Sequence, residues 1–208
     1  NKIVSGIYLA SQSPRRKEIL ESLEVDFEVF PISYNEDPPR DNESPIDYVE
    51  RNTKDKILAA SALLQTANQE IKPILTADTI VNLDGKVYGK PQNEDHGISM
   101  LLDLSGQYHS VITCIVIGKF KSKESEEVDL VINSIETQVL MRSLSANECK
   151  KYWHTGEPKD KAGGYAIQGK GSSFVEKING SFSNVVGLPI LETCQLLDQI
   201  NIDYWLTK

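Results

Sequence analysis

The chain has 208 residues, of which 39% are hydrophobic and 25% are charged, with only 9 prolines and 13 glycines. A chain of this length can bury a substantial core, so length and composition exclude a disordered or collagen-like protein and a small scaffold that depends on disulfides. The formal net charge of −8 argues against a protein that coats nucleic acid, although a few cations could still gather in one cleft.

The first part of the sequence predicts two helices among short strands. The predicted elements, in order, are a strand at 7–10, a helix that begins at Pro14 with Ser13 as its cap, a strand at 27–32, a polar proline-rich loop at 34–45, and a long helix that begins at Pro45 with Ser44 as its cap. The long helix carries apolar residues spaced by three and four from Ile46 to Leu64, which is typical of a helix with one buried face.

The remainder of the sequence alternates strands and helices. The predicted elements are a strand at 74–81, a hairpin turn at Asp84 and Gly85, a helix from Asn93 to about Leu104, a strand at 111–117, a long strand or strand pair at 128–141, a short helix with a capping box of Ser145 and Glu148, strands at 173–178 and 184–186 around an Asn179–Gly180 turn, and a terminal helix from Pro189 through Ile200. This order predicts an α/β fold, and the hairpins require a mixed sheet.

Cysteine and histidine usage gives no sign of a disulfide framework or a zinc site. The three cysteines are Cys114, Cys149 and Cys194, and the three histidines are His96, His109 and His154. The cysteines are odd in number and far apart, which favours a reducing, cytoplasmic compartment. The histidines form no metal-binding pair, so we expect them at the surface or in turns. No apolar stretch approaches the roughly 20 residues of a membrane span, and no secretory signal is visible, so no membrane partner is expected.

The start of the first predicted helix, S-P-R-R, is a candidate anion site. A helix N-terminus directs free backbone N–H groups and a partial positive charge toward whatever lies before it. Two hydroxyls and two guanidinium groups, which match phosphate oxygens, gather at this end. They belong to Ser11, Ser13, Arg15 and Arg16. A capped surface helix with two solvated arginines is the alternative interpretation.

Lys56 and Asp78 are two charged side chains in apolar surroundings. Lys56 lies at the edge of the buried face of the long helix, where no acid stands three or four residues away, so we expect a ligand to supply the anion. A lysine whose stem covers apolar surface is the alternative. Asp78 lies inside an apolar strand and should meet a cation, a metal or a hydrogen-bond network near a ligand site. A structural aspartate that caps a neighbouring turn is the alternative.

Three further residues are weaker candidates. Lys90, in G-K-P, could bind an anion or lie exposed in a turn, and Glu36, in the acidic loop, could reach a divalent ion or be solvated. Gln168 lies in the glycine-rich stretch DKAGGYAIQGKG, where closely spaced glycines let the backbone approach a ligand and the amide offers a donor and an acceptor. Glycines that only make a bulge or a tight bend are the alternative there.

Taken together, five blocks of sequence closely resemble the Maf family of nucleotide pyrophosphatases. They are LASQSPRRKEIL (9–20), TADTIVNLDGKVYGKP (76–91), LSGQYHSVIT (104–113), EPKDKAGGYAIQGKG (157–171) and NVVGLPI (184–190). The blocks occur in the family's order and span nearly the whole chain. Two positions depart from the family pattern: Asn35 stands where the first acid of an acidic pair is expected, and GGYAIQG replaces the commoner GAYGIQG.

The resemblance implies a single Maf-like pyrophosphatase domain over residues 1–208. The implied fold is α/β, similar to that of ITPases, with a mixed central sheet flanked by helices and two lobes around a cleft. The implied activity is hydrolysis of nucleoside triphosphates to the monophosphate and pyrophosphate, which removes unwanted nucleotides, with Mg²⁺ or Mn²⁺ as cofactor. The combination of SPRR, ADT and YxIQG is similar to the branch that acts on dTTP and UTP. The alternatives are a 7-methyl-GTP pyrophosphatase and a nucleotide-binding regulator of cell division without catalysis.

The resemblance also implies a role for each candidate residue. Asp78 matches the family's proton acceptor, and Glu36, the second acid of the loop pair, would share a metal with it. The positions that set substrate choice match Arg15, Thr79 and Gln168, and the phosphate-side positions match Ser11, Arg16, Lys56 and Lys90. The expected partner is a small-molecule nucleoside triphosphate, without nucleic acid or membrane, and a homodimer is suggested by analogy alone.

Overall fold

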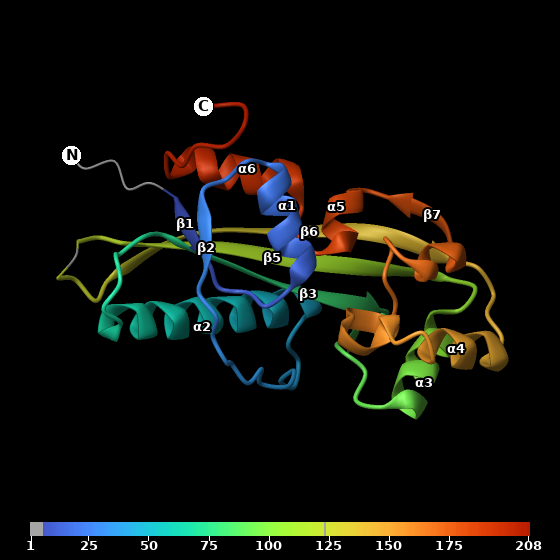
Figure 1. The fold of residues 1–208 in the computed structure, drawn as a ribbon. Coiled ribbons are helices and arrows are strands. Elements are labelled where there is room, and N and C mark those ends of the chain that lie inside the picture. Colours follow the sequence, from blue (N-terminus) through green and yellow to red (C-terminus); the bar gives the residue numbers. More distant parts are fainter. Residues whose placement is uncertain (1–5, 123) are drawn as a thin grey trace.

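The computed structural model describes residues 6–122 and 124–208 and contains a mixed seven-stranded sheet flanked by helices (Figure 1). The strands are β1 (Ile7–Leu9), β2 (Phe27–Val29), β3 (Ile74–Leu83), β4 (Lys86–Tyr88), β5 (Tyr108–Phe120), β6 (Val128–Met141) and β7 (Val175–Asn179). Their order across the sheet is β2-β1-β3-β5-β6-β7, and β4 pairs with β3 outside this path. The mixed α/β sheet predicted from the sequence is therefore confirmed.

The direction of the sheet changes at β3. Strand β1 is parallel to both β2 and β3, whereas β3, β5, β6 and β7 pair with one another in antiparallel fashion. The β3–β4 hairpin turns at Asp84 and Gly85, whose φ angles of 50° and 85° are those of the tight hairpin turn that the Asp-Gly pair favours. Ligands of open α/β sheets commonly bind where strand order switches, which here is the region around β1 and β3.

Helices cover both faces of the sheet. They are α1 (Pro14–Ser22), α2 (Pro45–Thr66), α3 (Glu94–Leu104), α4 (Ala146–Trp153), α5 (Phe182–Val186) and α6 (Ile190–Gln199). In Figure 1, α1, α5 and α6 lie over one face, α2 lies under the other, and α3 and α4 pack at the far end of the long strands. None of the helices in the described ranges combines the length and the apolarity that crossing a bilayer requires.

The alternation of side chains along β3 divides the core between the two faces. Leu75 and Ala77 pack with Leu20 of α1, whereas Ile74 and Ile80 pack in the cluster of α2. A third apolar cluster, formed with α3 and α4, lies at the far end of β3 and β5 and includes Val81, Val111, Leu101 and Tyr152. This cluster is separate from the two that lie against α1 and α2.

Local sequence signals located the helix starts well. Ser13, Ser44 and Asn93 each accept a hydrogen bond from a backbone N–H in the first turn of the helix that follows. Ser145 and Glu148 form both hydrogen bonds of the predicted capping box. These contacts satisfy N–H groups that have no partner within the helix, which is why the same residue types recur at this position.

The structure corrects two of the predicted strands. Residues 184–186, predicted as a strand, end helix α5, because Ser181 caps its first turn and Asn184 is fully buried. The Asn184 amide donates to Val111 O at 3.1 Å, Ile135 O at 3.1 Å and Thr137 Oγ1 at 2.9 Å, and these long-range bonds outweigh the β propensity of the local sequence. The predicted strand at 27–32 is the second correction, because it ends at Val29. Residues 128–141, predicted as a long strand or a strand pair, form one continuous strand.

The sequence predicted His109 at the surface or in a turn, and this prediction was wrong. His109 lies inside β5 with 2% of its area exposed. Its Nε2 is 2.6 Å from the hydroxyl of Tyr165, and its Nδ1 is buried without a hydrogen-bond partner in the described part of the chain. Burial lowers the pKa of His109 to about 4, because the surroundings do not solvate an imidazolium. The histidine is therefore neutral at physiological pH.

Burial of His109 predicts a loss of stability in mild acid. The unfolded chain protonates this histidine near pH 6.5, but the folded chain does so only near pH 4, so the unfolded state binds more protons between these values. We expect the free energy of unfolding to fall by about 2 kcal/mol between pH 8 and pH 5 on account of this one group. Urea denaturation at both pH values should show this loss in the natural chain and a smaller one in His109→Gln. An equal loss in both would contradict the prediction.

Candidate active site

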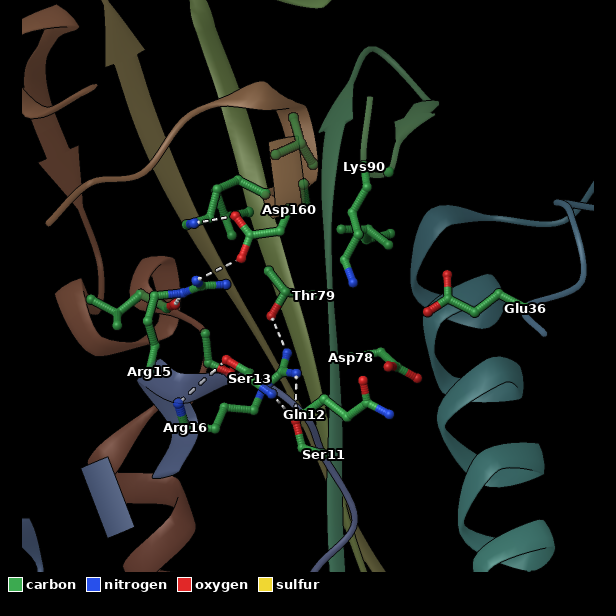
Figure 2. Close-up of a pocket in the computed structure, with 18 of the residues that line it drawn as sticks. Ser11, Gln12, Ser13, Arg15, Arg16, Glu36, Asp78, Thr79, Lys90 and Asp160 are labelled. Carbon is green, nitrogen blue, oxygen red and sulfur yellow. Dashed lines mark hydrogen bonds and ion pairs between the residues drawn. The ribbon is translucent and has the colours of Figure 1, made fainter. Parts of the chain in front are cut away.

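A cavity of about 520 Å³ lies where the start of α1, the middle of β3, the 34–45 loop and the segment after α4 meet (Figure 2). This segment contains three short 3-10 helices, Glu157–Asp160, Ala162–Gly164 and Lys170–Phe174. The volume is in the range of pockets that hold small ligands. The predicted site residues that line it are Ser11, Arg15, Arg16, Glu36, Lys56, Asp78, Thr79 and Lys90.

Arg16 ties the start of α1 to β3 and to the end of α5. Its Nε donates to Gly187 O at 2.8 Å, its second guanidinium nitrogen donates to Thr79 Oγ1 at 3.0 Å, and its first donates to Ser11 Oγ at 3.4 Å. Burial lowers the pKa of Arg16, which the charge of Asp78 opposes, but an arginine remains ionised at neutral pH. A fixed guanidinium beside a capped helix start forms an anion-binding corner.

Arg15 lies on the opposite side of this corner. Its Nε donates to Val186 O at 3.3 Å, and its guanidinium forms an ion pair with Asp160 at 3.7 Å. The chain therefore holds both arginines of the S-P-R-R motif by contacts to residues more than 140 positions away. The alternative of two solvated arginines on a surface helix is wrong.

Asp78 and Lys56 form an ion pair at the α2 side of the cavity. Lys56 Nζ donates to Asp78 Oδ1 at 2.7 Å and lies 3.4 Å from Ala77 O. The expectation that Lys56 lacks an acidic partner was wrong, because the partner comes from a strand 22 residues further along. The expectation that Asp78 meets a cation was right. Asp78 is 8% exposed, and its Oδ2 is buried without a hydrogen-bond partner among the described residues, so this atom is free to accept a bond from a ligand.

The neighbouring residues Asp78 and Thr79 point to opposite sides of β3. Asp78 faces Lys56 of α2, whereas Thr79 Oγ1 contacts Arg16 of α1 and lies 2.8 Å from Thr113 Oγ1. Figure 2 shows this separation, with Arg15 and Asp160 at one end of the cavity, Asp78 and Glu36 at the other, and Thr79 between them. The cavity therefore passes across the sheet at β3 and has two chemically different ends.

Glu36 and Lys90 complete the Asp78 end of the cavity. Figure 2 shows the Lys90 side chain extending into the cavity above Asp78, with the carboxylate of exposed Glu36 facing it from the other side. No group of three or more His, Cys, Asp or Glu side chains is gathered as a metal site in residues 6–122 or 124–208. Two carboxylates can nevertheless hold Mg²⁺ when phosphate oxygens and waters provide its remaining ligands. The carboxylates of Asp78 and Glu36 fit that requirement.

The loop that carries Glu36 is fastened to α2 by Arg51. The Arg51 guanidinium donates to the two Glu43 carboxylate oxygens at 2.7 and 2.9 Å and to Pro38 O at 3.1 Å. It also lies 3.6 Å from the Asp37 carboxylate. The hydrogen bonds from Arg51 lower the pKa of Glu43 to about 2, so the Glu43 carboxylate stays ionised at neutral and mildly acidic pH. We call this Arg51–Glu43 ion pair the clamp.

Replacement of Arg51 should make the 34–45 loop more mobile without changing the residues of β3 that line the cavity. In Arg51→Gln we expect faster proteolytic cleavage within residues 35–43, because the loop loses its bidentate attachment. At pH 4 the Arg51→Gln variant should still be cleaved faster than the natural chain, since the pKa of Glu43 lies below that pH and the clamp of the natural chain stays ionised. Limited proteolysis with mass spectrometry measures both effects, and Lys54→Gln on the exposed side of α2 is the control. Equal cleavage of all three proteins at pH 8 would refute the clamp.

One predicted site residue does not line the cavity. Gln168 is exposed, although its neighbour Ile167 does line it. Conversely, sequence reasoning did not single out Asp160 and Lys161, which line the cavity and pair with each other. Asp160 and Lys161 precede the glycines of the same stretch. An adjacent acid and base do not by themselves indicate a binding site, and only the fold shows that they lie beside Arg15.

Gly163 lets this segment approach β3 closely. A Cβ at this position would lie 2.7 Å from Val81 Cγ2, and the φ angle of Gly163 is +72°.

Comparison with known proteins identifies close relatives. The sequence profile of the Maf-like protein family matches residues 6–200. The dTTP/UTP pyrophosphatase of Saccharophagus degradans is 43% identical over 97% of this chain and 91% of its own. That of Photorhabdus laumondii is 46% identical over 92% of each chain. Among solved structures, a HAM1 protein from Coxiella burnetii superposes with a TM-score of 0.46 at 14% identity, covering 93% of this chain and 98% of its own.

Proposed function

Since the chain belongs to the Maf-like protein family, we propose that it is a nucleoside triphosphate pyrophosphatase that hydrolyses dTTP and UTP to the monophosphate and pyrophosphate. The observation that carries the proposal is the cavity that joins Asp78 to cations from three segments of the chain: α1, α2 and the stretch after β4. The cations are Arg15, Arg16, Lys56 and Lys90. A triphosphate bears several negative charges, and Arg16, Lys56 and Lys90 meet them despite the net charge of −8, while Arg15 lies at the other end of the cavity.

The proposed reaction begins with a water molecule beside Asp78. Asp78 Oδ2, which has no partner in the described chain, accepts a proton from this water as its oxygen attacks the α-phosphorus. The bond from the α-phosphorus to the bridging oxygen breaks, and pyrophosphate leaves with the bonding electrons. Lys56 holds the other carboxylate oxygen, Oδ1, at 2.7 Å and so fixes the direction of the accepting atom.

The leaving pyrophosphate carries the charge that the cations neutralise. Arg16 is held in place by three acceptors before any ligand binds, so it needs little reorganisation when charge develops. Ser11, beside Arg16, adds a hydroxyl to the same corner. A divalent cation, Mg²⁺ or Mn²⁺, held by Asp78 and Glu36 would supply further positive charge to the phosphate oxygens.

A panel of triphosphates with pyrophosphate detection tests the proposal. The panel contains dTTP, UTP, CTP, GTP, dATP and 7-methyl-GTP, each with and without Mg²⁺ or Mn²⁺. We expect dTTP and UTP to give the highest kcat/KM, and release to require the metal. Preferred turnover of 7-methyl-GTP would replace the proposed substrates. Tight binding of a nucleotide without any release of pyrophosphate would contradict the enzymatic function.

A further inference from the structure

Arg15, Asp160 and Lys161 form a row of charged groups at the end of the cavity away from Asp78. The Arg15 guanidinium lies 3.7 Å from Asp160 Oδ2, and the Lys161 ammonium donates to Asp160 Oδ1. The row thus presents a donor, an acceptor and a donor in sequence. All three residues line the cavity.

The row is held by the backbone on both sides. Arg15 Nε is bonded to Val186 O at 3.3 Å, and Lys161 Nζ is bonded to Glu157 O at 3.3 Å. The side chain of Lys161 is only 15% exposed. The Glu157 carboxylate in turn accepts the backbone N–H groups of Lys170 and Gly171 at 2.9 and 3.0 Å. Groups fixed in this way can discriminate between ligands, because they do not rearrange to suit a wrong one.

Asp160 is an acceptor only. Burial opposes its ionisation, but the hydrogen bond from Lys161 and the charges of Lys161 and Arg15 outweigh this, so the pKa of Asp160 is lowered. An ionised carboxylate can accept hydrogen bonds and cannot donate one. A ligand group that meets Asp160 must therefore carry a hydrogen.

We propose that this row reads the base of the nucleotide, with Asp160 accepting the N3–H of uracil or thymine and Arg15 and Lys161 donating to the two flanking carbonyl oxygens. This inference rests on the proposed function. The Watson–Crick edge of both bases is an acceptor, a donor and an acceptor, which is the complement of the row. Figure 2 shows Arg15 and Asp160 beyond Thr79 from Asp78, so a base bound here leaves the Asp78 end to the phosphates.

The other bases do not match the row. Cytosine has an unprotonated N3, which would face the Asp160 carboxylate with two acceptors opposed, and its amino group would face a cation. Guanine offers two adjacent donors. The Asp160 side chain is 59% exposed, so water solvates it until a base covers it. A polar group that the bound base covers and leaves without a partner costs more than a matched bond gains, so the mismatch falls mainly on the wrong base. Uracil and thymine differ only at C5, which is not part of the Watson–Crick edge. The row would therefore accept the bases of both dTTP and UTP, the two nucleotides in the names of the relatives.

The variant Asp160→Asn tests the inference, because its amide can donate to the N3 of cytosine. We expect the ratio of kcat/KM for UTP to that for CTP to fall at least about 10-fold. Asp129→Asn, an exposed carboxylate on β6, is the matched control and should leave the ratio unchanged. An equal loss on both substrates would mean that Asp160 only supports the fold, and would overturn the inference.

A modified substrate gives a second test that does not depend on the folding of a variant. 3-Methyl-UTP lacks the N3–H, so the unaltered protein should turn it over with kcat/KM at least about 10-fold below that for UTP. Turnover of 3-methyl-UTP at the rate of UTP would overturn the inference. If the unaltered protein released no pyrophosphate from UTP or dTTP, the proposed function itself would fail, and the base assignment with it.

Discussion

Replacement of Asp78 by asparagine is expected to lower kcat for UTP by about 100- to 10,000-fold while the protein stays folded. The asparagine keeps the size of the side chain but cannot take a proton from water at the position of Asp78 Oδ2. It also leaves Lys56 facing an amide in place of a carboxylate at 2.7 Å. Steady-state release of pyrophosphate measures the loss, and circular dichroism with thermal unfolding checks the fold.

The control for this experiment is again Asp129→Asn, which removes one negative charge from an exposed residue that does not line the cavity. It should retain full activity, which separates loss of a particular carboxylate from a change in net charge. Near-normal turnover by Asp78→Asn would remove Asp78 from the mechanism. If Asp78→Asn unfolds at assay temperature, the ion pair between Lys56 and Asp78 is needed for stability. The variant Asp78→Ser would then be assayed at a temperature below the Tm of that variant.

Replacement of Arg16 by lysine is expected to lower kcat/KM for UTP by about 100-fold. Lysine keeps the positive charge but has a single nitrogen, so it cannot reach Gly187 O, Thr79 Oγ1 and Ser11 Oγ together. The charge would then move when the ligand binds, and the pyrophosphate would lose a fixed counter-charge.

Lys17→Arg, the converse exchange at the next position of α1, is the matched control. Lys17 is exposed and its only ion pair in the described chain is with Glu21 at 3.9 Å, so the exchange should leave kcat/KM unchanged. Activity of Arg16→Lys within a factor of about 3 of the natural chain would show that charge alone suffices. The three fixed hydrogen bonds would then have no part in turnover.

The sequence predicted best those features that depend on neighbouring residues. The helix caps at Ser13, Ser44 and Asn93 and the turn at Asp84 and Gly85 each rest on contacts within a few positions. The buried run of β3 was equally visible, because a strand covered on both faces is apolar throughout. Such signals are complete within a short window of sequence.

The features that the sequence missed depend on distant partners. Lys56 has no acid within its own helix, and its partner Asp78 is brought to it only by packing of α2 on β3. Helix α5 forms where valines favour a strand, because the buried Asn184 amide bonds to β5 and β6. His109 stands just before the predicted strand at 111–117, and nothing local showed that β5 would include it or that Tyr165 would meet it. The importance of Asp160 likewise became visible only when Arg15 was placed beside it.

The position of Asp78 and Thr79, side by side in β3 but on opposite faces of the sheet, has a consequence for how this protein could diverge. Substitutions around Thr79 would repack against α1 and α5, while those around Asp78 would repack against α2, and the backbone of one strand separates the two neighbourhoods. Mutations of core residues in the two sets that share no contacts should therefore combine additively in their effect on the free energy of unfolding. A descendant of this gene could acquire a new ligand through changes on the α1 side that spare Arg16, and it would keep the Asp78–Lys56 pair of the α2 side.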